Sequence, residues 1–359
     1  MGGGPAKETV LCLNPQEEPK AIVSALRKKF PDIDIIYHQV SFTQSLADAH
    51  AEVPSHLWKK ATVLCTFNSL PEKNEAPHLN WLQLLSAGSN HIQGTPLWED
   101  KDVTITTASG IHGPQIAEWV VMTGLVQFHG YNKLYEQQKK HEWGKPKGMS
   151  TVRDRVGLRL GVLGYGSIGR QVGRVAKAMG MEVLAYTAGP KDTKEKKRDS
   201  GYIVPGTGDV EGEVPEEWYS GLDKESLHHF LKQDIDWLIV AVPLTKETKH
   251  FLSTEEFEIL SKRKAFITNI ARGPIIDQPA LISALKDGKL SGAALDVTDP
   301  EPLPADSELW DLENVTVTPH VSGQGTSYTE RAFQVLELNL EKRLAGERLV
   351  NVVDRGRGY

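Results

Sequence analysis

The sequence contains little cysteine, no long apolar run and no excess of basic residues. Cys12 and Cys65 are the only cysteines among 359 residues, too few for a disulfide framework, and both lie in apolar stretches typical of strands. We therefore expect two buried, reduced thiols in an intracellular compartment. The formal net charge of -6 gives no basic field for nucleic acid, and no run of about 18 apolar residues is present to span a membrane. No targeting signal is legible at either end, so the cytoplasm is the default expectation.

The most informative stretch is LGVLGYGSIGRQVGRVAKAMGMEVLA, residues 160–185. An apolar strand pattern leads into Gly164, Gly166 and Gly169, a helical pattern follows, and Gly180 ends it before a second strand pattern. This G-x-G-x-x-G frame is typical of a turn that binds the pyrophosphate of a dinucleotide. Glycine-rich turns are common, but the flanking strand and helix patterns favour the dinucleotide site over an ordinary turn.

Strand-like and helix-like patterns alternate along the whole chain, which predicts α/β architecture with parallel sheets. The length permits two domains of ordinary size. A helical pattern over 111–142 is long enough to be a single helix that crosses between them. Its aromatic residues suit a core, a hinge or a subunit contact, and the pattern does not separate these alternatives.

Two further segments are irregular in pattern. The polar stretch 145–155 is expected to be a linker, and 188–221, rich in Gly, Pro, Lys and Glu, an exposed excursion without regular structure. A final helix is expected over 327–344, where it can return to the first domain. No paired cysteines or histidines at metal-ligand spacing appear, so no metal site is predicted.

Three predicted strands after the glycine turn each end near an unusual polar residue. These residues are Arg272 in ITNIARGPIID, Glu301 in ALDVTDPEPLP and His320 in VTVTPHVSG. Taken separately, each residue also fits a role without chemistry: Arg272 as a surface cation, Glu301 as a loop charge and His320 as a turn residue. A small-residue loop, Ser86-Ala87-Gly88-Ser89, follows another predicted strand, at the edge where open α/β sheets place ligands.

Together these motifs resemble the D-isomer-specific 2-hydroxyacid dehydrogenase family. The central glycine turn, N-I-A-R-G, A-L-D-V with D-P-E-P, and T-P-H occur in that order across the chain. The resemblance implies two Rossmann-like or flavodoxin-like parallel-sheet domains. A dinucleotide-binding domain, 116–323, would be inserted into a discontinuous substrate domain, 1–115 with 324–359. It also implies a homodimer built through the cofactor domain and the crossing helix.

The chemistry of 2-oxo acid reduction suits the three polar residues. Arg272 offers a permanently charged planar fork for the substrate carboxylate and carbonyl. His320 is the natural proton donor, because the reference pKa of imidazole is about 6.5. Glu301 would orient the imidazole and favour its protonated form.

The resemblance assigns further roles. The amides of Ser86, Ala87, Gly88 and Ser89 would hold the substrate carboxylate, and Asp296 would contact the nicotinamide end. Residues expected to line the cofactor, besides the three glycines, are Ser167, Ile168, Thr187, Lys191, Pro243, Thr248, Ile270, Ala271 and Gly323.

Cofactor preference depends on the end of the second strand of the dinucleotide fold. NAD-selective folds commonly carry Asp or Glu there, whereas this sequence has Thr187, with Lys191 close behind. The sequence therefore favours NADP(H), with NAD(H) as the alternative. A nearby cluster of Lys194, Lys196, Lys197 and Arg198 is interpreted as a solvated loop.

The sequence thus predicts an NAD(P)H-dependent reductase that converts a 2-oxo acid to a D-2-hydroxy acid, similar to glyoxylate/hydroxypyruvate reductases. The alternative is a dinucleotide-sensing corepressor, because the same family includes corepressors that retain the catalytic trio. No nucleic acid or membrane partner is expected.

Overall fold

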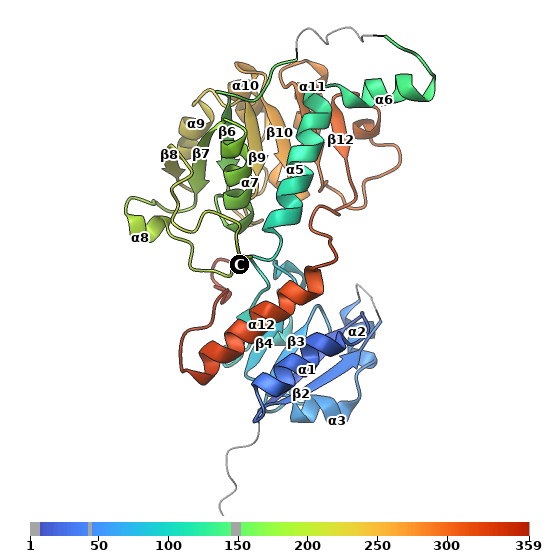
Figure 1. Cartoon of the computed structure of the whole chain (residues 1–359), viewed down its shortest axis with the longest axis vertical. Helices are drawn as coiled ribbons and strands as arrows, with labels where there is room; N and C mark the ends of the chain where they lie inside the picture. The colour runs from blue at the N-terminus through green and yellow to red at the C-terminus, as the bar shows by residue number, and fades with distance from the viewer. Residues whose placement is uncertain (1–7, 42–44, 145–151, 359) are drawn as a thin grey trace, which may run out of the picture. The chain divides into compact units, whose positions relative to one another are not determined.

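The computed structural model describes residues 8–41, 45–144 and 152–358. The first seven residues, and 145–151 of the predicted linker, lie outside the described residues. The chain divides into two compact units, 1–111 with 326–359, and 112–325 (Figure 1). The predicted division at 115/116 and 323/324 lies within a few residues of these boundaries, while the roles assigned to the two units stay predictions.

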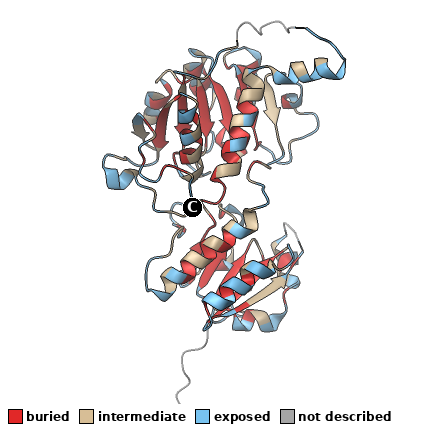
Figure 2. Ribbon diagram, in the orientation of Figure 1, coloured by how far each residue is buried: buried red, intermediate tan, exposed pale blue. Residues whose placement is uncertain are grey.

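The first unit is a parallel five-stranded sheet in the order β2-β1-β3-β4-β5. Cys12 and Cys65 lie in register on its neighbouring strands β1 and β3, and both are buried and free, as predicted. Strands β1, β3 and β4 are buried and β2 is partly exposed, and Figure 2 shows that the helices keep an exposed outer face. Its elements are β1 (Thr9–Asn14), α1 (Lys20–Lys29), β2 (Asp34–Gln39), α2 (Leu46–Ala51), α3 (Ser55–Lys60), β3 (Val63–Thr66), β4 (Trp81–Leu84), η1 (Asn90–Ile92), α4 (Pro96–Glu99), β5 (Thr104–Thr106) and α12 (Tyr328–Leu344).

The second unit is a parallel seven-stranded sheet in the order β12-β11-β10-β9-β6-β7-β8. One apolar cluster joins the sheet to α5 and α7, and a second joins its other face to α9, α10 and α11. Its elements are α5 (Gly113–Phe128), α6 (Tyr131–Lys139), β6 (Arg159–Leu163), α7 (Ser167–Ala178), β7 (Glu182–Thr187), α8 (Lys194–Lys197), β8 (Glu217–Ser220), α9 (Lys224–Leu231), β9 (Trp237–Val240), α10 (Thr254–Ser261), β10 (Phe266–Asn269), η3 (Gly273–Ile275), α11 (Gln278–Lys286), β11 (Gly292–Leu295), η4 (Glu308–Trp310) and β12 (Val315–Val317).

The two all-parallel sheets confirm the predicted α/β architecture, and α12 ends within the first unit as expected. The prediction of one helix over 111–142 is wrong. The helix stops at Phe128, and Gly130, with φ 60°, adopts the left-handed conformation that starts α6. Glycine reaches this conformation without the steric penalty that a side chain incurs, and the apolar pattern hid the break.

The prediction that 188–221 lacks regular structure is also partly wrong. The segment contains the short helix α8 and the edge strand β8, which pairs with β7. Asp209 within it is only 7% exposed. No helix among the described residues is long and apolar enough to cross a membrane.

Candidate active site

The three polar residues singled out in the sequence lie at one edge of the second sheet. Arg272 follows β10, Glu301 follows β11 and His320 follows β12, and these three strands are neighbours. Because the strands are parallel, their carboxyl ends meet at the same edge, which is also the edge where β6 enters the glycine turn. The topology therefore gathers in space residues that are separated in sequence.

His320 and Glu301 form a pair. The imidazole Nδ1 lies 3.2 Å from Glu301 Oε2, while Glu301 Oε1 accepts a hydrogen bond from the Thr298 amide at 3.1 Å. Both side chains remain partly exposed, at 50% for His320 and 39% for Glu301. The carboxylate is thus held by its own loop and orients the ring, leaving Nε2 as the nitrogen available to a substrate.

Asp296 holds the turn that carries His320. Its buried carboxylate accepts four hydrogen bonds, from the Thr318 hydroxyl at 2.6 Å, the Val321 amide at 2.9 Å, and the Ser322 amide at 3.0 Å and hydroxyl at 2.5 Å. The His320 amide donates to the Asp296 carbonyl at 2.9 Å. A carboxylate has about four lone-pair sites, so this one is fully occupied by the turn. The expected contact of Asp296 with nicotinamide stays a prediction, and what the geometry supports is a positioning role.

His320 itself has φ 55°, in the left-handed region that non-glycine residues seldom adopt. Strained backbone of this kind persists where the surrounding contacts determine it, and here the bonds to Asp296 supply them. The left-handed backbone at His320 therefore helps to set the direction of the imidazole.

Arg272 extends from the loop after β10, which contacts the loop after β11 that carries Glu301. One guanidinium nitrogen donates to the Ala271 carbonyl at 2.6 Å, and no other protein partner of the side chain is seen among the described residues. Burial lowers the pKa of Arg272, and the nearby Glu301 carboxylate opposes that shift. With a reference pKa above 12, the group stays charged, so it presents a partly desolvated cation with donors to spare.

Gly273 explains how the Arg272 loop approaches the Glu301 loop. A β-carbon on Gly273 would lie 1.8 Å from the Thr298 carbonyl oxygen, so no other residue fits. Asn269 braces the same loop, donating to the Arg272 carbonyl and accepting from the Ala271 amide. Ile270 and Ala271 are buried beneath it.

The glycine turn has the shape that a dinucleotide needs. Gly164 has φ 108° and lies against the backbone of Ala241, and a β-carbon on Gly169 would lie 2.4 Å from the Gly164 carbonyl oxygen. A β-carbon on Gly166 would meet nothing within 4 Å, so its backbone is open to a ligand. The first amides of α7, from Ser167 and Ile168 onward, lack intrahelical acceptors and suit a phosphate. These residues fit a bound pyrophosphate.

The remaining residues expected around the cofactor lie near the same sheet edge. Thr248, after β9, accepts from the Thr245 amide and donates to the Pro243 carbonyl at 2.7 Å, which fixes that loop. Gly323 accepts a hydrogen bond from Gln115 on α5 at 3.1 Å. Both residues serve the local backbone, and their cofactor contacts stay predictions.

Thr187 ends β7, and its hydroxyl donates to the Gly189 carbonyl at 2.8 Å. Lys191 is half-buried, and no ion pair of it is seen in the described part of the chain. Burial lowers its pKa, as do the nearby Arg170 and Lys196, while Asp199 opposes the shift. In the cluster interpreted as a solvated loop, Lys196 pairs with Asp192 and Arg198 with Glu211, both on the surface. Lys191 is therefore one cation of this region for which the described residues show no carboxylate in ion-pair contact.

The loop Ser86 to Ser89 belongs to the first unit. The Ser86 hydroxyl donates to the Gly88 carbonyl at 2.8 Å and the Ser89 hydroxyl to the Gly358 carbonyl at 3.3 Å. Within 8–41, 45–144 and 152–358, no acceptor is seen for the amides of Ala87, Gly88 and Ser89. A run of such amides at a strand's carboxyl end suits an anion.

The sequence reasoning missed Arg170, which directly follows the glycine turn. It is 4% exposed and bonded to the segment 197–209. A helix arginine normally signals a solvated position, and its partners are distant in sequence, so no local pattern pointed to it.

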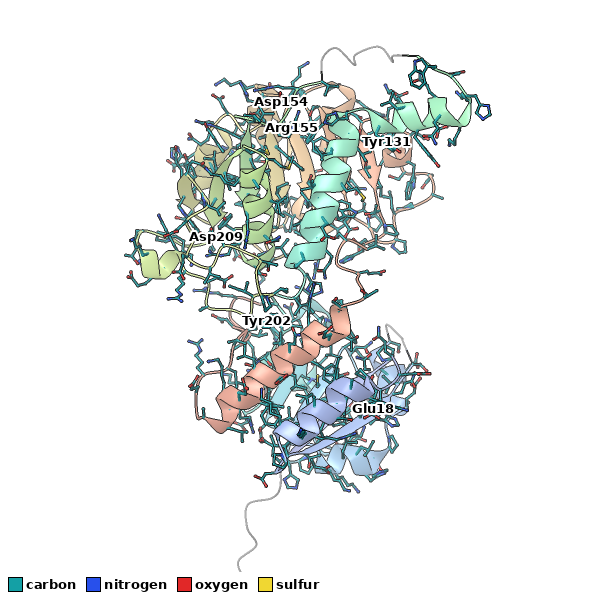
Figure 3. The ribbon with its side chains drawn as sticks, in the orientation of Figure 1. Glu18, Tyr131, Asp154, Arg155, Tyr202 and Asp209 are labelled. Atoms are coloured by element: carbon teal, nitrogen blue, oxygen red, sulfur yellow. The ribbon has the colours of Figure 1, made fainter. Side chains whose placement is uncertain are left out.

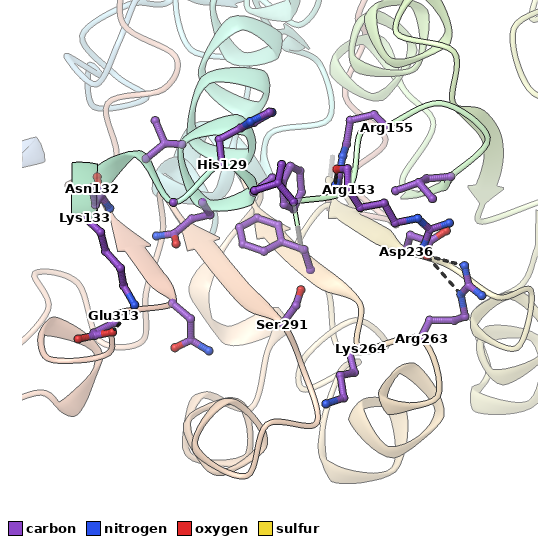
Figure 4. Close-up of a pocket in the computed structure, with 18 residues that line it drawn as sticks. His129, Asn132, Lys133, Arg153, Arg155, Asp236, Arg263, Lys264, Ser291 and Glu313 are labelled. Carbon is purple, nitrogen blue, oxygen red and sulfur yellow. Dashed lines mark hydrogen bonds and ion pairs between the residues drawn. The ribbon is translucent and has the colours of Figure 1, made fainter. Parts of the chain in front are cut away.

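A cavity of about 440 Å³ lies elsewhere in the second unit (Figure 4). It is lined by residues of the α5–α6 junction and of segments that precede β6, β9 and β10. These are the amino ends of the strands, opposite the edge that carries Arg272 and His320. Arg263 in its wall binds Asp236 at 2.7 Å, and Arg155 stacks on Phe128. The cavity is thus separate from the candidate active site.

His228 lies near Glu255 and Glu256, a grouping that resembles metal ligands. However, Glu256 is already bound by the His228 imidazole at 2.6 Å and by the Lys224 ammonium at 2.9 Å. Lys224 thereby balances the charge of Glu256 within the protein.

The chain is similar to known dehydrogenases and reductases in sequence and in structure. The family described as "D-isomer specific 2-hydroxyacid dehydrogenase, NAD binding domain" matches residues 121–205 and 208–322. A glyoxylate reductase of Thermofilum pendens is 26% identical over 319 residues, covering 88% of this chain and 86% of that protein. A glyoxylate/hydroxypyruvate reductase B of Erwinia tasmaniensis is 30% identical over 261 residues, covering 71% and 72%. Alignments with the glyoxylate reductases of Thermococcus kodakarensis and Pyrococcus furiosus span 49% of those proteins.

Among solved structures, a D-isomer specific 2-hydroxyacid dehydrogenase from Xanthobacter autotrophicus, in complex with NADPH and MES, is similar along the chain. It has a TM-score of 0.73 at 27% identity and covers 99% of this chain and 100% of that one. The similarity to one family extends along most of the sequence. It accompanies the sheet order, the glycine turn and the sheet edge that carries Arg272, Glu301 and His320. The chain belongs to the D-isomer specific 2-hydroxyacid dehydrogenase family.

Proposed function

We propose that the protein is an NADP(H)-dependent reductase that converts a 2-oxo acid to a D-2-hydroxy acid. The observation that carries this proposal is the meeting of Arg272, Glu301 and His320 at the sheet edge that also holds the glycine turn. The names of the similar proteins, which include glyoxylate and glyoxylate/hydroxypyruvate reductases, support the same reaction class.

In the proposed reaction a reduced nicotinamide supplies a hydride to C2 of the 2-oxo acid. His320 then gives the Nε2 proton to the carbonyl oxygen, which becomes the hydroxyl group. Glu301 stabilises the imidazolium through Nδ1 before that transfer. Arg272 polarises the carbonyl and binds the carboxylate, which holds the substrate in one orientation for the hydride. In the reverse direction the same imidazole accepts the hydroxyl proton.

The amides of Ala87, Gly88 and Ser89 are proposed to bind the substrate carboxylate. Their lack of acceptors among the described residues supports this role. Backbone donors select for an anion and not for the side chain of the 2-oxo acid.

NADP(H) is proposed as the preferred cofactor, with NAD(H) as the alternative. Thr187 lacks the carboxylate that would repel a 2′-phosphate, and among the described residues no carboxylate lies in ion-pair contact with Lys191. The similar Xanthobacter protein forms a complex with NADPH, which is consistent with this preference.

A homodimer is proposed from the exposed aromatic residues after α5. No residue of α6 is buried, its Tyr131 and Tyr135 are 50% and 46% exposed, and Trp143 is fully exposed. Clustered aromatic residues on a surface are typical of interfaces. Light scattering should report a dimer, and Trp143→Ala with Tyr135→Ala should weaken it, whereas Trp310→Ala, at another exposed tryptophan, should not.

The direct test of the activity is turnover. Purified protein with NADPH should reduce members of a panel containing glyoxylate, hydroxypyruvate, and branched and aromatic 2-oxo acids. Arg272→Lys should raise KM and lower kcat together, because the planar fork is lost while the charge remains. Folded protein that binds NADPH but reduces none of the panel, and that instead binds a protein partner only with the dinucleotide, would support the corepressor alternative.

A further inference from the structure

The connection between β7 and β8 is fastened at one point by Arg170. This arginine lies in the first turn of α7, directly after Gly169, and is 4% exposed. Its Nη1 donates to the Asp209 carbonyl at 2.5 Å and its Nη2 to the Lys197 carbonyl at 2.6 Å. Its Nε lies 3.6 Å from the Asp199 carboxylate. One side chain therefore ties both halves of the connection to the helix that begins at the glycine turn.

The surroundings of Arg170 compensate for the cost of burying a charge. The guanidinium carbon lies 5.3 Å from the Tyr165 ring centroid and 5.8 Å from that of Trp218. Asp209, labelled in Figure 3, accepts from the Tyr165 hydroxyl at 2.9 Å and from the amides of Glu213 and Val214. A planar fork that reaches two carbonyls at once suits arginine and not lysine.

The two halves of the connection also contact each other at this point. The Asp199 amide donates to the Val210 carbonyl at 2.8 Å. Gly212 has φ 72°, and a β-carbon there would lie 2.6 Å from the carbonyl oxygen of Lys197, one of the groups that Arg170 binds. Glycine at 212 therefore allows the contact that Arg170 closes.

Lys191 lies on the same connection, four residues after the end of β7. Besides burial, Arg170 and Lys196 lower the pKa of Lys191 and Asp199 raises it, so these three charges act on its ammonium group. Since Asp199 is engaged by Arg170 and Lys196 by Asp192, the site keeps a surplus of positive charge. A dianionic group such as a phosphate monoester balances such a surplus, and an unmodified ribose does not.

We propose that Arg170 is a positioning residue for cofactor selection: it fixes the connection 188–216 so that Lys191 is held for the 2′-phosphate of NADP(H). This inference rests on the proposed function, since it presumes that the glycine turn binds a dinucleotide. Arg170 itself does not touch the phosphate. Its effect passes through the backbone of residues 197–209 to the segment that carries Lys191.

Two variants test the proposal by different routes. Arg170→Lys keeps the charge but loses the fork, and Gly212→Ala pushes Lys197 away without altering α7. Arg174→Lys is the control on the helix, because Arg174 shows one hydrogen bond to the part of the chain that the structure describes, to the Gly208 carbonyl at 3.3 Å. Gly206→Ala is the control in the connection, because Gly206 also has positive φ, 78°, but has open space for a β-carbon.

The measurements are Kd for NADPH and for NADH, from tryptophan fluorescence, with thermal unfolding and amide exchange of each variant. Arg170→Lys and Gly212→Ala should each weaken NADPH about tenfold, leave NADH within about twofold, and speed exchange in 191–214. Both controls should keep the ratio of the two Kd values. If Arg170→Lys does not fold, Gly212→Ala carries the same expectation.

Three results would overturn the proposal. The first is an unchanged ratio of the two Kd values in both variants, although faster amide exchange shows that residues 191–214 have been released. The second is equally weakened binding of NADPH and NADH, which would mean that Arg170 serves only the fold. The third is a wild-type preference for NADH. Wild-type protein that binds neither dinucleotide would instead contradict the proposed function itself.

Discussion

The β-carbon position of Gly273 lies 1.8 Å from the carbonyl oxygen of Thr298, so the loop that carries Arg272 rests directly on the loop that carries Glu301. Gly273→Ala should therefore separate the two loops. We expect a loss of stability of about 1–3 kcal/mol, as for other overpacked sites, and a larger fall in kcat/KM than the stability loss explains, because Arg272 moves.

Thermal unfolding and steady-state kinetics check this prediction. Gly325→Ala is the stability control, because a β-carbon there meets nothing within 4 Å. A Gly273→Ala protein with wild-type kcat/KM would show that the contact between the loops does not position Arg272.

His320 and Glu301 should have different kinetic signatures. His320→Asn removes the proton donor and should lower kcat by about 10² to 10⁴, with little change in the Kd of NADPH.

Glu301→Gln should have a smaller effect on kcat than His320→Asn. The Kd of NADPH should stay near the wild-type value, because the Glu301 carboxylate, 3.2 Å from the imidazole Nδ1, acts by orienting the ring. A wild-type kcat in Glu301→Gln would remove the proposed role of Glu301.

Thr187 is expected to contribute to cofactor preference. Thr187→Asp places a carboxylate at the end of β7, which should repel a 2′-phosphate and bind free ribose hydroxyls, shifting kcat/KM toward NADH. Thr187→Ser is the matched control, because it keeps the hydroxyl that donates to the Gly189 carbonyl. If Thr187→Asp leaves the ratio of NADPH to NADH unchanged, discrimination lies elsewhere on the connection.

Glu256 should make the stability of the second unit depend on pH. Burial raises the pKa of its carboxyl, but bonds from His228, Lys224 and the Ser253 amide outweigh burial, so the net pKa is lowered. A folded-state pKa below the unfolded value of about 4.3 stabilises the fold above that pH. The contribution is lost as pH falls through the folded value.

Glu256→Gln should accordingly lower the free energy of unfolding by about 1–3 kcal/mol at pH 7, and the difference from wild type should shrink below about pH 4. Denaturant titrations at both pH values measure this. Glu258→Gln, at an exposed pair with Lys289, should change stability by less than about 1 kcal/mol at either pH. A deficit of Glu256→Gln that persists unchanged at acid pH would point to lost packing instead.

Local patterns were sufficient to predict the parallel α/β architecture and the residues at the sheet edge. Arg272, Glu301 and His320 each follow an apolar strand pattern, and parallel strands place such residues at one edge without further information. The glycine turn could also be predicted from a local pattern, because the three glycines that it requires lie within six residues.

Features that depend on distant contacts were not legible. Arg170 looks like a solvated helix residue until the segment 197–209 folds onto it. Asp209 and β8 were hidden in a stretch without periodicity, and the break at Gly130 was hidden in apolar periodicity that continues on both sides. In each case the contact or backbone conformation that determines the structure produces no periodic pattern in the sequence.

Isotope transfer distinguishes direct passage of a hydride from the cofactor to C2 of a 2-oxo acid, with a D product, from other routes. NADPH carrying deuterium at C4, in each of its two configurations, is oxidised by the wild-type protein with the best substrate of the panel, and the product is resolved by chiral chromatography and mass spectrometry. Direct hydride transfer should place deuterium at C2 of the D-2-hydroxy acid from one configuration only. Product without deuterium from either configuration, or an L product, would contradict it.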